Sequence, residues 1–69
     1  MPNSMDVLKE KIAAANLTQD LLAAKIGVNP STLYRKIKSG GAGFTVGEVH
    51  RIVDELHLTD IEAQDIFLS

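Results

Sequence analysis

The sequence predicts an all-α domain of five helices, and three observations support this prediction. Two Thr-x-x-Glu sequences, which begin at Thr45 and Thr59, each open a stretch with apolar residues at helical spacing, as a capping box does. Residues 19–38 have the spacing of two short helices joined by a tight turn. Apolar residues near the N-terminus recur every three or four positions, as on one face of a helix. A chain of 69 residues, 45% of them hydrophobic, suffices for one small domain.

The first two helices are expected over residues 5–15 and 19–26, after a flexible leader of residues 1–4. The apolar face of the first helix is expected to consist of Val7, Leu8, Ile12 and Ala15. The pattern is then interrupted, and Thr18 has the side chain that caps the second helix by accepting a backbone N–H.

The residues between the second and third helices fit a sharp reversal of the chain. Two helices that cross steeply need a small side chain at their closest approach, which Ala23 provides. Gly27 can adopt the positive φ that the turn requires at little cost. Val28 is then expected to fill the corner between the helices, and Leu33 to hold the third helix against the second.

Helix-start signals also predict the three remaining helices. Asn29 is a good N-cap, and Pro30 after it is suited to the first helical position. The two capping boxes open the fourth and fifth helices, after a glycine-rich loop that ends the third. The expected ranges of these three helices are 30–38, 46–56 and 60–68. The inner face of the fourth helix is expected to consist of Val46, Val49, Ile52, Val53 and Leu56.

The net charge is −2, but the charges are separated along the chain. Residues 21–47 contain four basic residues and no acidic ones, whereas residues 48–69 contain six acidic residues and one arginine. This separation predicts a positive helix pair that faces away from a negative C-terminal half. The absence of cysteine excludes a disulfide and a thiolate zinc site. No apolar run approaches the roughly 20 residues of a membrane span, and we expect a cytoplasmic protein without a signal peptide.

Residues 17–35 contain Leu17-Thr18-Gln19, Leu22-Ala23, Ile26-Gly27-Val28-Asn29 and Ser31-Thr32-Leu33-Tyr34-Arg35. This run resembles the Cro/C1-type (XRE-family) helix-turn-helix regulators of phages and bacteria. The segments 44–49 and 58–67 resemble the fourth and fifth helices of small phage-type members, so that the resemblance covers nearly the whole chain from Met5 onward. It implies a five-helix, lambda-repressor-like helix-turn-helix domain, with its core at residues 19–38. It also implies a transcriptional regulator that binds double-stranded operator DNA, often as a dimer.

In helix-turn-helix docking, the N-terminal part of the third helix enters the DNA major groove. The outward residues expected to read bases there are Ser31, Tyr34 and Arg35. The Arg35 guanidinium can donate to guanine O6 and N7, although a phosphate contact fits this residue equally well. Ser31 could instead cap the first turn of the helix, and Tyr34 could instead be buried against the fourth helix.

The resemblance places Gln19 at a DNA phosphate, at the N-terminus of the second helix and with Thr18 beside it. Lys36 and Lys38 are also predicted phosphate contacts, although solvated lysines have the same signature in a sequence. Pro30 departs from the family pattern, because some members have a long amide there that reads adenine and braces the first glutamine. Proline can do neither, so base reading depends on its neighbours or on DNA shape.

Two further interpretations remain open. The acidic total charge, Pro30 and the apolar C-terminal residues also fit an antirepressor-like module on the same fold, which sequesters a second regulator protein. A homodimer is a compatible prediction, because two-fold pairing doubles the small interface of one recognition helix. Its candidate contacts are the outer face of the fourth helix and Ile66, Phe67 and Leu68, although Ile66 and Phe67 could instead close the protein's own core. The sequence predicts no enzyme, no metal site and no cofactor.

Overall fold

The computed structural model describes residues 4–68, and this range contains five α-helices and no strand. The helices are α1 (Ser4–Ala14), α2 (Gln19–Ile26), α3 (Pro30–Lys38), α4 (Val46–Leu56) and α5 (Asp60–Phe67). The predicted all-α class is confirmed, and the first and fifth helices each end one residue earlier than expected. Ser4, expected in the leader, begins α1, and the rest of that leader lies outside the described residues. Ala15, expected on the apolar face of the first helix, lies beyond its end and is exposed.

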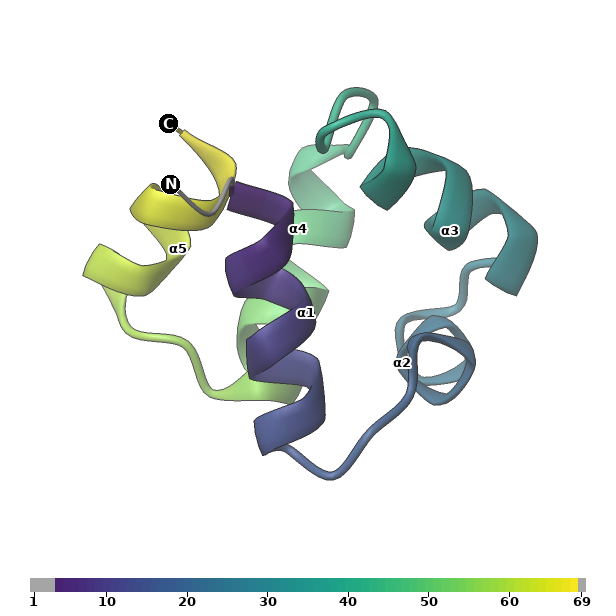
Figure 1. Ribbon diagram of the computed structural model, residues 1–69, viewed down its shortest axis with the longest axis horizontal. Helices are drawn as coiled ribbons and strands as arrows, with labels where there is room; N and C mark the ends of the chain where they lie inside the picture. The colour runs from purple at the N-terminus through teal and green to yellow at the C-terminus, as the bar shows by residue number, and fades with distance from the viewer. Residues whose placement is uncertain (1–3, 69) are drawn as a thin grey trace.

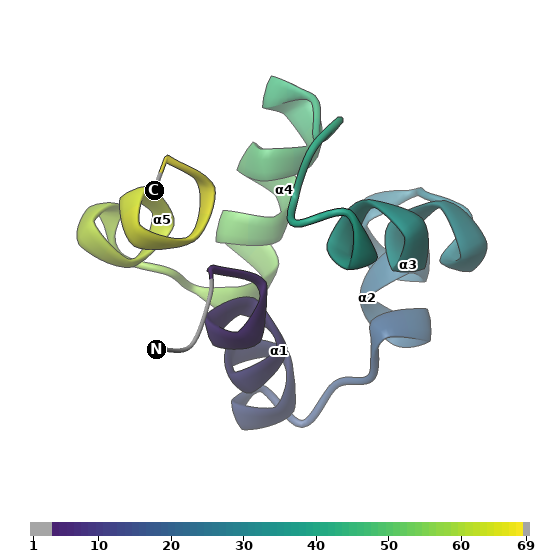
Figure 2. The ribbon, with the colours of Figure 1, turned by 45° about the horizontal axis from the view of Figure 1, so that its top comes forward.

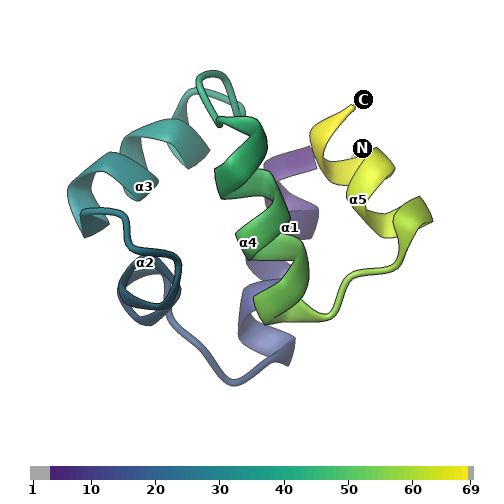
Figure 3. The same cartoon turned by 180° about the vertical axis from the view of Figure 1, so that it is seen from behind.

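The helices α1 and α4 lie in the middle of the molecule and separate the α2–α3 pair from α5 (Figure 1, Figure 2). α2 packs against both α3 and α4, whereas α5 packs against α1. The basic α3 and the acidic α5 therefore lie on opposite sides of the protein, which is also clear from behind (Figure 3). No helix within the described range is long and apolar enough to cross a membrane.

Side chains cap the helix starts as predicted. Thr18 Oγ1 accepts, at 3.1 Å, the N–H of the residue three positions later. At α4, Thr45 Oγ1 accepts the N–H of Glu48 at 3.1 Å, and Glu48 Oε1 accepts the N–H of Thr45 at 2.9 Å. The same reciprocal bonds join Thr59 and Glu62 at 3.2 and 2.9 Å. Because each box satisfies two backbone donors at the helix N-terminus, it fixes the residue at which the helix begins.

The hydrophobic core draws its largest fully buried side chains from α1, α2, α3 and α4. They are Leu8, Leu22, Ile26, Leu33 and Ile52. In α4 the prediction was wrong for Val46, which is 75% exposed, and Val49 is only half-buried. Val46 lies about 120° around the helix from Ile52, because each residue advances about 100°. The buried face of α4 is therefore centred on Ile52 and Leu56.

The chain reverses between α2 and α3 at Gly27, which has the predicted positive φ, at +74°. The next amide, that of Val28, donates to Ala23 O at 2.9 Å and so ties the turn to the last helical residues. Ala23 is fully buried and Val28 is half-buried against the core, as predicted. From α4, Arg51 Nη1 donates to Ile26 O at 3.0 Å, so that α4 caps the C-terminus of α2.

Two lysine–glutamate ion pairs join helices within residues 4–68. Lys36 Nζ on α3 lies 2.7 and 2.9 Å from the two carboxylate oxygens of Glu48 on α4. Lys11 on α1 pairs with Glu62 on α5. The Lys36 ammonium and the N–H of the cap residue lower the pKa of the Glu48 carboxyl. In the same way, Lys11 and a cap N–H lower the pKa of Glu62 to about 2.

We expect the protein to lose stability in acid, because both glutamates are held ionised in the folded state. Their contribution is complete above the ordinary glutamate pKa of 4.5 and is lost as the pH falls through the lowered folded-state values, to about 2 for Glu62. Lys36→Met should therefore flatten the dependence of the unfolding free energy on pH below 4.5. Urea unfolding at several values between about pH 7 and pH 2.5 measures this dependence.

The matched control for this experiment is Lys25→Met, which removes an exposed lysine outside both ion pairs. It should leave the dependence of stability on pH unchanged. If Lys36→Met and the wild-type protein lose stability equally between these pH values, the ion pair with Glu48 does not contribute in solution.

Candidate nucleic-acid interface

The exposed face of α3 carries all three residues predicted to read bases. Ser31, Tyr34 and Arg35 are exposed, Tyr34 by 56%, and they lie on one face because residues three and four apart are neighbours on a helix. The alternative that Tyr34 is buried against α4 is therefore wrong. On the opposite face, Leu33 and Ile37 are buried in the core and hold α3 in place. The position of the exposed face is thus set by well-packed apolar residues.

Ser31 and Arg35 on α3 keep hydrogen-bonding groups that are available to a ligand. Asn29 caps the helix, since Asn29 Oδ1 accepts the N–H of Ser31 at 2.8 Å. The Ser31 hydroxyl is consequently not the cap and can bind elsewhere. Arg35 Nη2 lies 3.4 Å from Thr32 Oγ1, a long hydrogen bond that leaves the other guanidinium donors of Arg35 for a ligand.

Tyr34 borders two hollows on this side of the protein. The first, which we call the mixed-charge hollow, has a volume of about 470 Å³ and is lined by Asp20, Pro30, Ser31, Tyr34 and Arg35. It combines the acceptors of one carboxylate with the donors of one guanidinium. Asp20 was not predicted as a site residue, because an acidic residue in the first turn of a helix is common for its effect on the helix dipole.

The second hollow, which we call the cationic hollow, has a volume of about 90 Å³ and is lined by Lys9, Gln19, Tyr34, Ile37 and Lys38. It brings together Gln19 and Lys38, both predicted phosphate contacts. Gln19 Oε1 is buried, and no hydrogen-bond partner within residues 4–68 reaches it. Lys9 was missed in the sequence, because only the packing of α1 beside α2 and α3 brings it to this site.

Thr18 lies next to Gln19 at the start of α2. Its oxygen already accepts the N–H that it caps, at 3.1 Å, and the residue is exposed. A hydroxyl can donate its proton while its oxygen accepts, so capping does not prevent Thr18 from binding a phosphate oxygen.

Lys36 is in a different position from the one predicted. Instead of facing solvent as a phosphate contact, its ammonium binds Glu48 in α4 and lies 5.9 Å from the centre of the Phe44 ring. Only 20% of its side chain is exposed. The physical reason is that Lys36 stands beside the buried Ile37 and Leu33 on the helix, on the side turned toward the start of α4. We therefore assign Lys36 to the attachment of α3 rather than to the interface.

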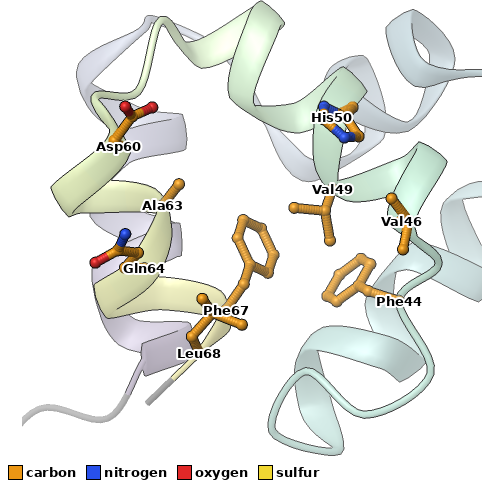
Figure 4. Close-up of a pocket in the computed structure, with 9 residues that line it drawn as sticks. All are labelled: Phe44, Val46, Val49, His50, Asp60, Ala63, Gln64, Phe67 and Leu68. Carbon is orange, nitrogen blue, oxygen red and sulfur yellow. The ribbon is translucent and has the colours of Figure 1, made fainter.

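A third hollow lies between α4 and α5 (Figure 4). This groove, which we call the α4–α5 groove, has a volume of about 440 Å³ and is lined by Phe44, Val46, Val49, His50, Asp60, Ala63, Gln64, Phe67 and Leu68. The rings of Phe44 and Phe67 meet edge to face, with their centres 5.7 Å apart. Val46 and Leu68 at its borders are 75% and 79% exposed.

The groove divides the C-terminal residues that were predicted to mediate dimerisation. Ile66 is buried and closes the protein's own core, as the alternative interpretation held. Phe67 is half-buried, packs against the same core and also forms part of the groove wall, whereas Leu68 is exposed at the groove border. Apolar side chains thus remain accessible at this end of the protein.

Comparison with known proteins gives no match to a family model, to a curated protein sequence or to a solved structure. The chemistry of the three hollows is therefore the basis for assigning a function. The cationic hollow suits the oxygens of a phosphate, and the mixed-charge hollow suits a ligand edge with both donors and acceptors. The two hollows share Tyr34, so one extended ligand could occupy both.

Proposed function

We propose that the protein is a sequence-specific, DNA-binding transcriptional regulator of the phage or prophage Cro- or repressor-like type, with a lambda-repressor-like helix-turn-helix fold. In this proposal α2 and α3 form the helix-turn-helix, and α3 enters the major groove of operator DNA. The observation that carries the proposal is the arrangement of the two hollows. Side chains suited to base reading line one hollow and side chains suited to phosphate binding line the other, and the contact of α2 with α3 sets their spacing.

The cationic hollow would provide much of the affinity. Two ammonium groups, those of Lys9 and Lys38, can neutralise a phosphate, and the start of α2 adds backbone N–H groups. The side-chain NH2 group of Gln19 and the hydroxyl of Thr18 would donate hydrogen bonds to the same phosphate. Phosphate contacts of this kind fix the register of the protein on the duplex and carry no sequence information by themselves.

The mixed-charge hollow would provide the specificity. Arg35 can form two hydrogen bonds with the O6 and N7 atoms of a guanine in the major groove. Ser31 can reach a base edge in the first turn of α3, and the Tyr34 ring can pack on a thymine methyl group. Both side chains are exposed, and neither has to leave the core to reach DNA.

The direct test is to incubate the tagged protein with fragmented genomic DNA at about 150 mM salt and to sequence the bound fragments. Enrichment of a few sites that share an inverted repeat would support a specific, dimeric regulator. Uniform recovery, or no recovery, would contradict the proposal, because the polar face of α3 would then have no preferred duplex.

The α4–α5 groove is proposed to pair two copies of the chain. The groove offers apolar walls, while Val46 and Leu68 at its borders project into solvent, so each copy carries both a hollow and the side chains to fill one. Such a surface suits an isologous contact, in which each copy presents the same patch. None of the residues that line the groove belongs to α3, so the exposed faces of both recognition helices stay free for the two half-sites of an operator.

We expect Leu68→Asp to weaken self-association by about tenfold or more, because a charge would then be buried in an apolar contact. Ile61→Asp is the matched control, because Ile61 is also exposed, by 71%, but lies outside the groove lining. Sedimentation equilibrium over a range of concentrations measures both. Equal dissociation constants for the two variants would exclude the groove as the dimer contact. If the protein does not associate with itself and binds only a different protein through the groove, the groove is the binding site of that other protein.

A second candidate function is an antirepressor-like module that binds and sequesters another regulator. The acidic side chains of α5, together with the absence of a polar side chain at Pro30, favour it. A regulator with a basic DNA-binding face could then bind the acidic side of this protein. Co-purification of such a regulator, with no mobility shift of any duplex at about 100 mM salt, would distinguish it from the first proposal.

A further inference from the structure

We infer that Asp20 is a specificity-determining residue, which accepts a hydrogen bond from the N4 amine of cytosine while Arg35 binds the guanine paired with it. The two side chains would together read one G·C base pair from the major groove. This inference rests on the proposed DNA-binding function and extends it from α3 to α2.

Asp20 belongs to α2 but lies at the mixed-charge hollow. It is the second residue of α2, yet its side chain lines the mixed-charge hollow together with Ser31 and Arg35 of α3. Asp20 is exposed and belongs to neither of the ion pairs found within residues 4–68. Its carboxylate is therefore available to a ligand in this hollow.

Pro30 also lines the hollow and lies between Asp20 and Arg35 in the sequence. A proline side chain has no donor or acceptor, so it cannot read a base at the start of α3. Asp20 of α2 lines the same hollow. A polar group from α2 can then act at a place where a longer side chain on α3 would otherwise stand.

A G·C base pair has both hydrogen-bond acceptors and a hydrogen-bond donor on its major-groove edge. In the major groove, a G·C pair presents the acceptors O6 and N7 of guanine and, beside them, the N4 donor of cytosine. A guanidinium and a carboxylate that line one hollow are complementary to this pattern, because the first only donates and the ionised second only accepts. The phosphates of any duplex repel a carboxylate on this face. Only a duplex that offers the carboxylate a hydrogen-bond donor offsets this repulsion, so Asp20 would weaken binding to sequences that lack the donor.

The dipole of α2 gives an acidic residue in the first turn a second, sequence-independent role. That role predicts an effect on stability and a uniform effect on affinity, but none on the choice of base. The two roles are therefore separable by measuring binding to duplexes that differ at one base pair.

The experiment compares wild-type protein and Asp20→Ala on the best selected duplex and on all single substitutions of it. For the wild type we expect one G·C position at which every substitution lowers affinity by about tenfold or more. In Asp20→Ala this penalty should fall several-fold at that position alone, while the penalties elsewhere remain. Asp65→Asn, which removes an exposed charge on the remote α5, should change no position selectively.

A change on the DNA side tests the same hydrogen bond without altering the protein. N4-methylcytosine keeps its pairing with guanine but places a methyl group where the major-groove donor was. At the Asp20 position it should weaken binding by wild-type protein and have little effect on Asp20→Ala.

The inference is overturned if Asp20→Ala leaves the penalty at every base pair unchanged, whether its affinity for all duplexes rises, falls or stays the same, or if N4-methylcytosine affects both proteins alike. Failure of the DNA-binding proposal itself has a different signature, because wild-type protein would then select no duplex at all.

Discussion

Arg35→Ala should abolish most of the sequence preference of the protein while leaving its fold intact. The guanidinium is exposed and has one long hydrogen bond, 3.4 Å to Thr32 Oγ1, so its removal costs the folded state little. On DNA, the loss of a bidentate contact with guanine should reduce discrimination at that base pair by about 1–3 kcal/mol, roughly 5- to 150-fold. Titration of the selected duplex and of a scrambled duplex measures the ratio of the two affinities.

Lys38→Ala is the informative comparison, because Lys38 lines the cationic hollow and is assigned to a phosphate. It should weaken binding to both duplexes equally and reduce the slope of log affinity against log salt by about one. If Arg35→Ala instead behaves like Lys38→Ala, then Arg35 binds phosphate, which is the alternative that the sequence leaves open. Unchanged binding in both variants would mean that DNA does not contact this face.

Leu33→Ala should remove a large fraction of the protein's stability. Leu33 is fully buried and joins α3 to the core, so the truncation leaves a cavity under the recognition helix. Such substitutions cost about 2–5 kcal/mol. The whole domain of 69 residues has a stability of only about 3–10 kcal/mol at the usual value per residue. Urea denaturation followed by circular dichroism measures the loss.

Leu21→Ala provides the control for this prediction, since Leu21 is also a leucine of the α2–α3 pair but is 51% exposed. Its effect should be within about 0.5 kcal/mol of zero. A loss below about 1 kcal/mol for Leu33→Ala would show that α3 can relax into the cavity, and the fixed geometry of its exposed face would then be in doubt.

The helix boundaries could be predicted from sequence because the signals that set them are local. Thr45 and Thr59 each act on a glutamate three residues away, and Gly27 acts on its own backbone. None of these effects requires knowledge of a distant element. The burial predicted for Val46 was wrong because its apolar side chain lies at an angular position outside the buried face of α4.

The site was only partly predictable, because several of its members are defined by contacts between helices. Lys36 has the same local sequence features as a solvated lysine, and only the packing of α3 beside α4 pairs it with Glu48. Lys9 and Asp20 enter the two hollows from α1 and α2, which a helical-face argument about α3 alone cannot reveal. The residues that were predicted correctly to be exposed, such as Tyr34 and Arg35, lie on α3 itself.

The hydrogen bond from Arg51 to Ile26 O has a consequence for protein engineering. Because this bond comes from α4 and closes the end of α2, residues 19–38 are not a self-sufficient cassette that can be grafted into another scaffold. To keep the turn in its present shape, a chimera would need α4 of this protein as well, or an arginine at the equivalent place in the scaffold that receives the segment. A portable segment must therefore extend at least from Thr18 to Leu56, about twice the length of the two helices that would touch DNA.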